Sequence, residues 1–295
     1  MPDRIQMLIE IALQEDIGTG DITTAALFGD DPLAVPQKTA VIVAKEDLVL
    51  AGLEIVRRVF DTVDHHLGWE RFCEDGQVIP RGGKIARISG RLDSLLKAER
   101  TALNFLQHLS GIATLTRQFV DKVKKYPVQI LDTRKTTPGM RALEKHAVRA
   151  GGGKNHRLGL YDRFLIKDNH LMGVSITEAI RRAKTQNPNK VPIEIEIDSA
   201  DQIEEAIAAG ATIILMDNFS PKDLKKAVEK VAKRAKVEAS GGITLDHVVD
   251  YAKMGVDFIS IGALTHSARS VDVSLEIRTV SLSFGNVEWI GAKKQ

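Results

Sequence analysis

The sequence has little of what several protein classes require. Its 295 residues contain one cysteine, Cys73, so no disulfide can form within the chain and a reducing compartment is expected. No apolar run approaches the roughly 20 residues that cross a bilayer. The first residues mix acidic side chains with apolar ones at helical spacing, unlike the basic start and continuous apolar core of a secretory signal. We therefore expect a folded cytoplasmic protein that does not enter a membrane.

A strong net charge is also lacking, because 41 Lys and Arg residues stand against 39 Asp and Glu residues. The cations are nevertheless concentrated: residues 134–167 hold nine Lys and Arg and only two acidic residues. Nucleic-acid binding usually needs a basic surface over a whole domain, often with exposed aromatics, and aromatic residues make up only 5% of this chain. This distribution predicts a small polyanionic ligand and no nucleic acid.

The first part of the chain, residues 1–112, has the mixed pattern of an α+β domain. An amphipathic helix is predicted at residues 4–15, and strands at KTAVIVAKEDLVLAG and at EDGQVIPRGGKIARISGR. Apolar residues then recur at helical spacing up to Pro127, and Gly111 is predicted to divide two helices across a domain boundary. The tail, residues 271–295, returns to alternation and is expected to pair back with this domain.

Residues 113–270 alternate short apolar runs with helical segments, which predicts parallel strands joined by right-handed crossovers. The apolar runs are VQILDT, DRFLIKDN, VPIEIEID, ATIILMDN, KVEASGG and DFISIGA. Six or so such units favour a catalytic domain built as an open, incomplete α/β barrel. A doubly wound open sheet is the alternative.

Cationic residues follow the early strands, at the edge where parallel α/β folds place their sites. Arg134 and Lys135 end the first run, and an arginine there can grip a carboxylate while a lysine binds a phosphate. His156 and Arg157 lie in the glycine-rich stretch GGGKNHR. Lys167 ends RFLIK, where it is predicted to hold an anion, form a Schiff base or make a structural ion pair.

Acidic residues follow the middle strands. Strict alternation in IEIEIDS puts Glu194, Glu196 and Asp198 on one face, and Asp217 follows the apolar run IILM. An edge strand facing water would explain the alternation, whereas in a buried parallel sheet the carboxylates need cations, hydroxyls or a metal. Two carboxylates at neighbouring strand ends, without cysteines or clustered histidines, predict Mg²⁺ shared with phosphates.

Small residues follow the last two strands. Backbone amides and helix N-termini at such positions bind phosphate in many barrels, although either segment alone is also typical of a tight turn. The residues predicted to form this phosphate site are Ser240, Gly241, Gly242, Gly262 and Ala263.

In this order, the motifs resemble the quinolinate phosphoribosyltransferases, or nicotinate-nucleotide pyrophosphorylases (carboxylating), of the type II phosphoribosyltransferase family. The resemblance covers most of the chain, through EDIGTGDITT, ERTALNFLQHLSGIAT, LDTRKTTPGMR, KHAVRAGGGKNHRLGLYDRFLIKDNH, EIEIDS, ILMDNF, EASGGI and ISIGALTHSA. It implies that quinolinate attacks phosphoribosyl pyrophosphate, pyrophosphate leaves and CO2 is lost, giving nicotinate mononucleotide for NAD biosynthesis. It also implies an N-terminal α/β domain, an open barrel of about seven strands and a homodimer with a shared active site.

The resemblance implies roles for particular residues. Arg134, His156 and Arg157 match the positions that hold the quinolinate carboxylates, with Lys135 beside them. Arg100 matches an arginine that reaches in from the neighbouring subunit. The positions around the ribose, pyrophosphate and metal match Lys167, Glu196 and Asp217, and the loops that bind the 5′-phosphate match Ser240, Gly241, Gly242, Gly262 and Ala263.

Three other functions fit the same residues. A related enzyme of a molybdate-uptake system would keep the fold and use another acceptor. A barrel aldolase would use Lys167 as a Schiff-base nucleophile. A regulator on the same fold would bind a sugar phosphate without turnover.

Overall fold

The computed structural model describes residues 3–29 and 35–278. The chain divides into two compact units, of which the first contains residues up to Gly111 and from Arg269 onward. The second unit is Ile112–Ala268. No described helix is long and apolar enough to cross a membrane.

The first unit is built on an antiparallel sheet with strand order β12-β1-β5-β3. Strand β12 pairs with β1, as predicted for the start of the tail, whereas residues 279–295 of the predicted tail lie outside the described residues. The elements are α1 (Arg4–Ile17), α2 (Ile22–Phe28), β1 (Gln37–Ala44), β2 (Leu48–Val49), α3 (Leu53–Val63), β3 (Gly68–Arg71), β4 (Val78–Ile79), β5 (Lys84–Arg91), the start of α4 (Leu92–Val123) and β12 (Val273–Arg278).

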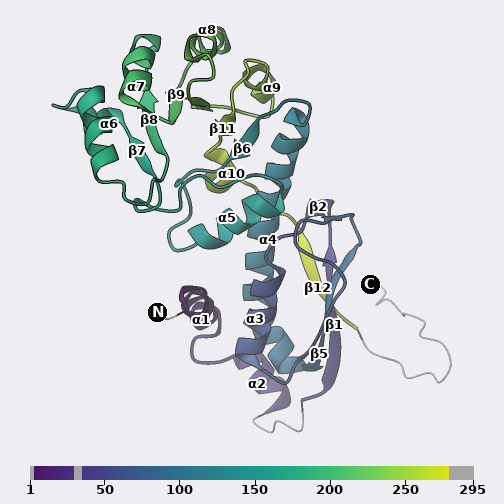
Figure 1. The fold of residues 1–295 in the computed structure, drawn as a ribbon. Coiled ribbons are helices and arrows are strands. Elements are labelled where there is room, and N and C mark those ends of the chain that lie inside the picture. Colours follow the sequence, from purple (N-terminus) through teal and green to yellow (C-terminus); the bar gives the residue numbers. More distant parts are fainter. Residues whose placement is uncertain (1–2, 30–34, 279–295) are drawn as a thin grey trace. The chain divides into compact units, whose positions relative to one another are not determined.

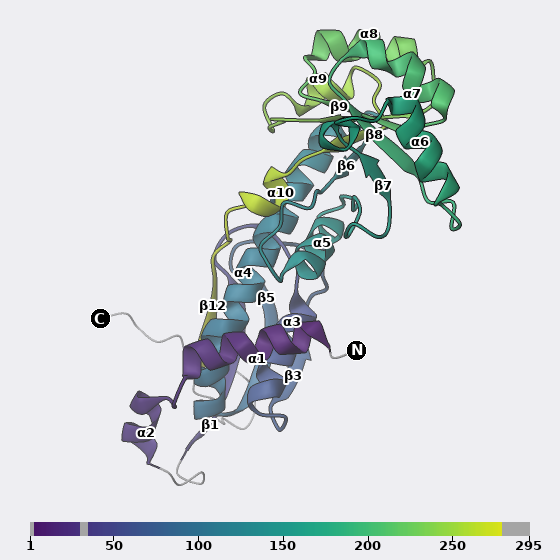
Figure 2. The same ribbon diagram turned by 90° about the vertical axis from the view of Figure 1, so that its left-hand side faces the viewer.

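The core of this unit lies between the sheet and its helices. Helix α3 buries Val56, Val59 and Phe60, and helix α4 buries Leu103 and Leu106. Figures 1 and 2 show α3 and the start of α4 against one face of the sheet, with α1 beside α3. Apolar side chains at helical spacing therefore give each helix one buried face.

Helix α4 corrects one sequence prediction, because it is a single helix of 32 residues rather than two helices. Gly111 lies inside it without ending it. A Cβ atom at this position would come 2.2 Å from the backbone oxygen of Arg269, so the glycine provides room for another segment to approach the helix. A mid-helix glycine costs about 1 kcal/mol relative to alanine, which the remaining turns of this long helix tolerate.

The second unit contains a parallel sheet of six strands in the order β6-β11-β10-β9-β8-β7. Figures 1 and 2 show α6 to α9 on one side of it. Its elements, after the end of α4, are β6 (Gln129–Leu131), α5 (Arg141–Ala150), β7 (Phe164–Ile166), η1 (Asp168–Leu171), α6 (Ile176–Thr185), β8 (Ile193–Ile197), η2 (Ala200–Gln202), α7 (Ile203–Ala209), β9 (Ile213–Asp217), α8 (Pro221–Val231), β10 (Lys236–Ser240), α9 (Val248–Ala252), β11 (Phe258–Ser260) and α10 (Ala263–His266).

The predicted α/β class with a parallel sheet is confirmed. Strands β7 to β11 lie in chain order, and the first strand, β6, pairs with the last, β11, which is the strand order of a barrel. The sheet has six strands among the described residues, against about seven expected. A single parallel bridge between Leu131 and Lys154 stands where a further strand would lie.

Strand register brings the predicted site residues together at one edge of this sheet. Asp217 of β9 is the direct neighbour of Ser240 of β10. Glu196 of β8 pairs with Leu215 of β9, which lies two residues before Asp217. Because all six strands run in the same direction, the polar residues that end them share this edge.

Candidate active site

A cavity of about 590 Å³ lies at the carboxyl ends of the parallel strands. Twelve of the thirteen predicted site residues line it. Residues not predicted for the site, among them Thr133, Glu238 and Ser260, also line it. The twelve are Arg134, Lys135, His156, Arg157, Lys167, Glu196, Asp217, Ser240, Gly241, Gly242, Gly262 and Ala263.

The thirteenth predicted residue, Arg100, lies in the first unit. It is an exposed residue of helix α4 and does not line this cavity. Its expected role, reaching into the site of a neighbouring subunit, stays a prediction.

Arg157 gives one wall of the cavity a buried positive charge. Arg157 is only 6% exposed, and its Nε atom has no hydrogen-bond partner among the described residues. One guanidinium nitrogen donates a long bond of 3.4 Å to the Arg163 carbonyl. Burial and the nearby charge of Arg134 lower the pKa of Arg157. Because an unpaired buried guanidinium is costly, this arrangement is suited to an anionic ligand.

The backbone that carries Arg157 is fixed by a buried ion pair between Asp132, after β6, and Lys145 of α5. Asp132 also accepts from the Asn155 amide and, at 2.8 Å, from the His156 N–H. Lys145 in turn donates to the His156 carbonyl at 3.0 Å. Burial raises the pKa of Asp132 and lowers that of Lys145, and the attraction between them opposes both shifts. The His156 peptide is thus held from both sides.

Both ring nitrogens of His156 already contact other groups of the protein. Its Nδ1 accepts the backbone N–H of Arg157 at 2.7 Å, so the ring proton must be on Nε2. Nε2 lies 3.1 Å from a carboxylate oxygen of Glu194. In this conformation His156 lines the cavity with both ring nitrogens engaged by other protein groups.

The structure distinguishes the three acidic residues that alternation made equivalent. Glu194 is fully buried below the cavity, Glu196 lines it, and Asp198 is exposed beyond the end of β8. Glu196 accepts a hydrogen bond from the ammonium group of Lys167. At the end of the neighbouring strand β9, Asp217 accepts a hydrogen bond from the Asn218 side-chain amide at 2.6 Å. This side of the cavity therefore combines two carboxylates with one lysine.

The glycine loop after β10 provides backbone groups next to these acids. Gly241 has φ +102°, and a Cβ atom there would come 2.8 Å from the Asn218 backbone nitrogen, so only glycine fits. Gly242 has φ +59° and open space beside it. The predicted helix N-termini are less developed than expected, because α9 has five residues and α10 has four. Loop amides rather than long helix dipoles are therefore the candidate phosphate donors.

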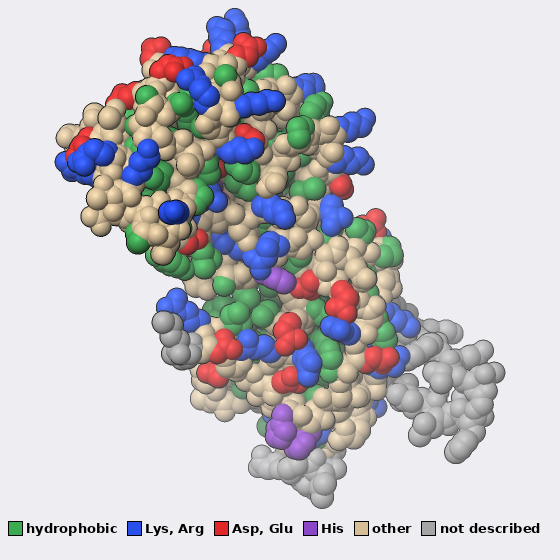
Figure 3. Space-filling model, viewed as in Figure 1, with side chains coloured by type: hydrophobic (Ala, Val, Ile, Leu, Met, Phe, Trp, Pro, Cys, Tyr) green, Lys and Arg blue, Asp and Glu red, His purple; other side chains and the backbone are tan. Residues whose placement is uncertain are grey.

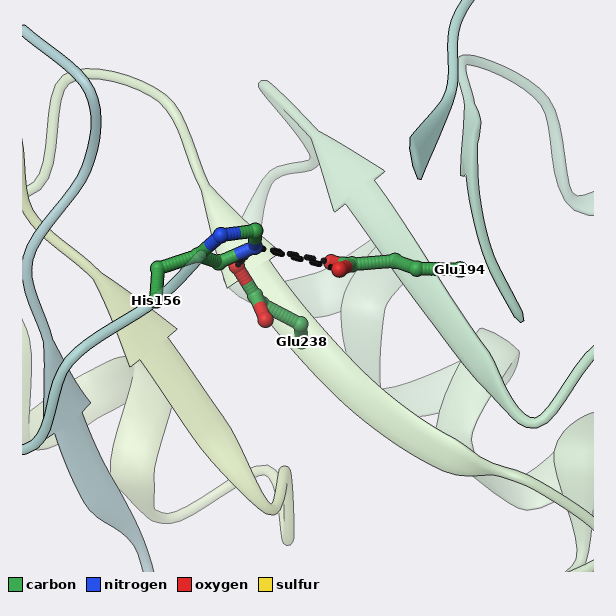
Figure 4. A group of neighbouring side chains, drawn as sticks. All are labelled: His156, Glu194 and Glu238. Atoms are coloured by element: carbon green, nitrogen blue, oxygen red, sulfur yellow. Dashed lines mark hydrogen bonds and ion pairs between the residues drawn. The ribbon is translucent and has the colours of Figure 1, made fainter. Parts of the chain in front are cut away.

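Below the cavity lies a buried polar group of His156, Glu194 and Glu238 (Figure 4), whose nearest ligand atoms are all within 4.8 Å of one another. A metal ion does not fit there, because Nε2 of His156 carries the ring proton and a metal-bound histidine normally donates from its other nitrogen. Arg163 also lies 3.3 Å from Glu194 and already balances its charge.

Glu238 was missed by the sequence reasoning. An acidic residue between Val237 and Ala239 in a strand buried on both faces was the available signal, since such a charge needs a partner. Burial, followed by the charge of Glu194, raises the pKa of Glu238 well above its usual value. Burial opposes ionisation of Glu194, but the hydrogen bond from His156 and the charge of Arg163 outweigh it, so the pKa of Glu194 is lowered.

Comparison with known proteins identifies the family. The model described as "Quinolinate phosphoribosyl transferase, C-terminal domain" matches residues 112–276, and the model of the N-terminal domain matches residues 21–110. The chain belongs to the quinolinate phosphoribosyltransferase family.

Individual members of this family are similar over nearly the whole chain. A probable nicotinate-nucleotide pyrophosphorylase [carboxylating] of Bacillus subtilis is 43% identical over 97% of this chain and 96% of its own. The nicotinate-nucleotide pyrophosphorylase [carboxylating] of Mycobacterium leprae is 41% identical over 93% and 98%. Among solved structures, the nicotinate-nucleotide pyrophosphorylase of Francisella tularensis superposes with a TM-score of 0.89 at 39% identity, over 94% and 96%. The family resemblance expected from the sequence motifs is confirmed.

The buried ion pair leads to a prediction for stability. Replacing Lys145 by Met would leave the Asp132 carboxylate buried without its cation, which we expect to lower the free energy of unfolding by about 3–5 kcal/mol. Urea denaturation followed by circular dichroism measures the change. The matched control is Lys236→Met, which removes an exposed partner of Asp257 and should cost less than about 1 kcal/mol. Equal effects would contradict the role assigned to the buried pair.

Proposed function

We propose that this protein is a quinolinate phosphoribosyltransferase (nicotinate-nucleotide diphosphorylase, carboxylating). It transfers phosphoribose from phosphoribosyl pyrophosphate to the ring nitrogen of quinolinate, releases pyrophosphate and CO2, and forms nicotinate mononucleotide for NAD biosynthesis. The observation that carries this proposal is the buried guanidinium of Arg157, with its Nε unpartnered, in the cavity of a chain of this family.

Quinolinate fits the cationic wall because its two adjacent carboxylates can be held by Arg134 and Arg157, with Lys135 beside them. The Lys135 backbone is fixed through its carbonyl, which accepts from the Thr265 hydroxyl at 2.7 Å. A ligand with one carboxylate, such as nicotinate, would leave a buried cation unpaired, so the site favours quinolinate. His156 acts on this wall through the backbone and ring contacts that place Arg157.

Phosphoribosyl pyrophosphate fits the side of the cavity opposite the wall that carries Arg134 and Arg157. Its 5′-phosphate is placed at the backbone amides of the loops that contain Ser240, Gly241, Gly242, Gly262 and Ala263. When pyrophosphate leaves, the ribose gains positive charge, which the carboxylates of Glu196 and Asp217 stabilise. Lys167 holds the departing anion from the same side.

Mg²⁺ fits the acidic side of the cavity. Glu196 and Asp217 offer hard oxygen ligands at neighbouring strand ends, and they are the residues that would hold the ion. When bound, Mg²⁺ neutralises pyrophosphate charge and so makes it a better leaving group.

Decarboxylation follows from the chemistry of the substituted ring. Once the ring nitrogen carries ribose it is positively charged, and it accepts the electron pair left by the departing 2-carboxylate. The protein's contribution is to orient the ring and to exclude water from it.

The proposed assembly is a homodimer in which Arg100 enters the partner's cavity. Exposed apolar side chains of α1 and α2 support an interface on the first unit, since Ile11, Ile22 and Leu27 are 63%, 82% and 72% exposed. Higher oligomers are compatible with this proposal. On the face shown in Figure 3, Lys and Arg side chains are interspersed with acidic ones, which favours small-molecule substrates over nucleic acid. A cytoplasmic location remains the expectation.

The alternatives have less support. A Schiff-base aldolase needs a free lysine, whereas the ammonium group of Lys167 donates to Glu196. A relative from a molybdate-uptake system differs in its acceptor, and paired arginines for two carboxylates favour quinolinate.

A variant of the cationic wall tests the acceptor. Arg134→Ala should raise the KM for quinolinate at least about 30-fold, equivalent to about 2 kcal/mol for a lost charged hydrogen bond, and change the KM for phosphoribosyl pyrophosphate little. Steady-state kinetics with each substrate varied in turn measures both constants. Arg182→Ala, which removes an exposed partner of Glu178 on α6, is the control and should change neither. An equal rise in both constants for Arg134→Ala would contradict its assignment to quinolinate.

Subunit mixing tests the shared site. Arg100→Ala and Lys167→Ala should each be nearly inactive alone. If Arg100 serves the partner's cavity, random reassociation of equal amounts yields mixed dimers with one intact site, and recovers about a quarter of wild-type activity. Activity is measured before and after mixing, with the Lys167→Ala protein mixed with itself as the control. No recovery from confirmed mixed dimers would show that Arg100 acts within its own chain or outside the site.

A further inference from the structure

The floor of the cavity contains a carboxyl group that the reaction described so far does not use. Glu238 of β10 lines the cavity, yet its side chain is 0% exposed to solvent. It lies next to His156 and Glu194, which come from a loop and from β8, as Figure 4 shows. The cationic wall and the phosphate loops border the same cavity.

The hydrogen bonds on the floor are distributed unequally between the two glutamates. The Glu194 carboxylate accepts a hydrogen bond from Nε2 of His156, with 3.1 Å between Nε2 and the oxygen, and it lies 3.3 Å from the Arg163 guanidinium. The Oε1 atom of Glu238 accepts from the Ser260 hydroxyl and is 3.6 Å from His156. The Oε2 atom of Glu238 has no partner among the described residues. An ionised Glu238 would therefore leave a buried oxygen uncompensated beside the charge of Glu194, whereas a protonated one carries an O–H that Glu194 accepts when no substrate is bound.

The charged groups around Glu238 favour the protonated form. Burial, the charge of Glu194 and a hydrogen bond shared with Glu194 raise the pKa of Glu238 well above its usual value, and the Ser260 hydroxyl and Arg163 only partly offset them. A buried carboxylic acid kept neutral at pH 7 can act as a proton donor in an enzyme.

The proposed reaction needs such a donor. Loss of CO2 breaks the bond between the ring and its 2-carboxylate and leaves an electron pair on that ring carbon, next to the charged nitrogen. A proton must reach this carbon to complete nicotinate mononucleotide. Of the lysines that line the cavity, Lys167 donates to Glu196, and Lys135 is exposed at the mouth.

We propose that Glu238 is the acid that protonates the ring carbon after decarboxylation. The proton moves from the Glu238 carboxyl to the carbon, a C–H bond forms with the electron pair left by CO2, and Glu238 becomes a carboxylate. Water restores its proton after the product leaves. Ser260 positions the carboxyl group through its hydrogen bond to Oε1.

The test separates the two halves of the reaction in a single turnover, and it rests on the proposed phosphoribosyl transfer to quinolinate. Glu238→Gln has almost the same shape and no acidic proton. We expect pyrophosphate release to stay within about twofold of the wild-type rate, because the acid acts after that step. Formation of nicotinate mononucleotide should fall by about 100-fold or more, as is typical for loss of a general acid. The undecarboxylated mononucleotide should accumulate, because a ring carbon that is not protonated recombines with the CO2 still held in the cavity. Quenched-flow sampling with chromatography of both nucleotides measures the two rates.

Glu238→Asp provides a second variant that keeps the acid but withdraws it by one methylene group. It should show the same selective loss to a smaller degree. Glu204→Gln, an exposed residue paired with Arg234, is the matched control and should change neither rate. Circular dichroism confirms folding, and we expect Glu238→Gln to fold because the glutamine amide is uncharged and has almost the shape of the protonated carboxyl group.

Equal slowing of both steps in Glu238→Gln, or no slowing of either, would overturn the role of Glu238 and assign the proton to Lys135 or to water. Wild-type protein that forms neither nucleotide from quinolinate would instead contradict the proposed function itself.

Discussion

The carboxylate of Asp132 fixes the backbone on which the cationic wall of the cavity is built. It pairs with Lys145 and accepts from Asn155 and from the His156 N–H, all of them buried or nearly so. Together with the bridge between Leu131 and Lys154, these bonds hold the loop after α5 in the conformation that buries Arg157. Because the loop is held, a guanidinium can remain buried with its Nε unpaired until a ligand arrives. Such preorganisation reduces the cost of ordering the site on binding.

The parallel sheet determines the opposite wall. Its strands end at one edge, so acidic residues of β8 and β9 and the glycine loop after β10 are neighbours although they are far apart in sequence. The resulting cavity has cations on one side and carboxylates on the other. That division suits a dicarboxylate and a sugar diphosphate bound side by side, and it explains how a chain of nearly balanced charge carries a strongly cationic segment.

Much of the site could be predicted from the alternation of strands and helices. This alternation indicates a parallel sheet, and the residues that end parallel strands lie together at one edge of it. Depth along a strand could not be predicted: Glu194, Glu196 and Asp198 share a face, but one is buried, one lines the cavity and one is exposed. The close approach of the Arg269 backbone to α4 at Gly111 could not be predicted either, because it joins residues far apart in sequence. Hydrogen bonds between distant residues also engage the His156 ring and leave only the Oε2 atom of Glu238 without a partner among the described residues, and no local sequence pattern specifies these contacts.

The central claim is that this cavity joins quinolinate to phosphoribose and then removes CO2. The most direct measurement incubates the purified protein with quinolinate, phosphoribosyl pyrophosphate and Mg²⁺, and follows nicotinate mononucleotide and CO2 together, with nicotinate as the control acceptor. The account predicts equal amounts of both products from quinolinate and no nucleotide from nicotinate. Folded, dimeric protein that forms neither product from quinolinate would contradict it, and nucleotide formed equally well from nicotinate would contradict the two-arginine basis of its selectivity.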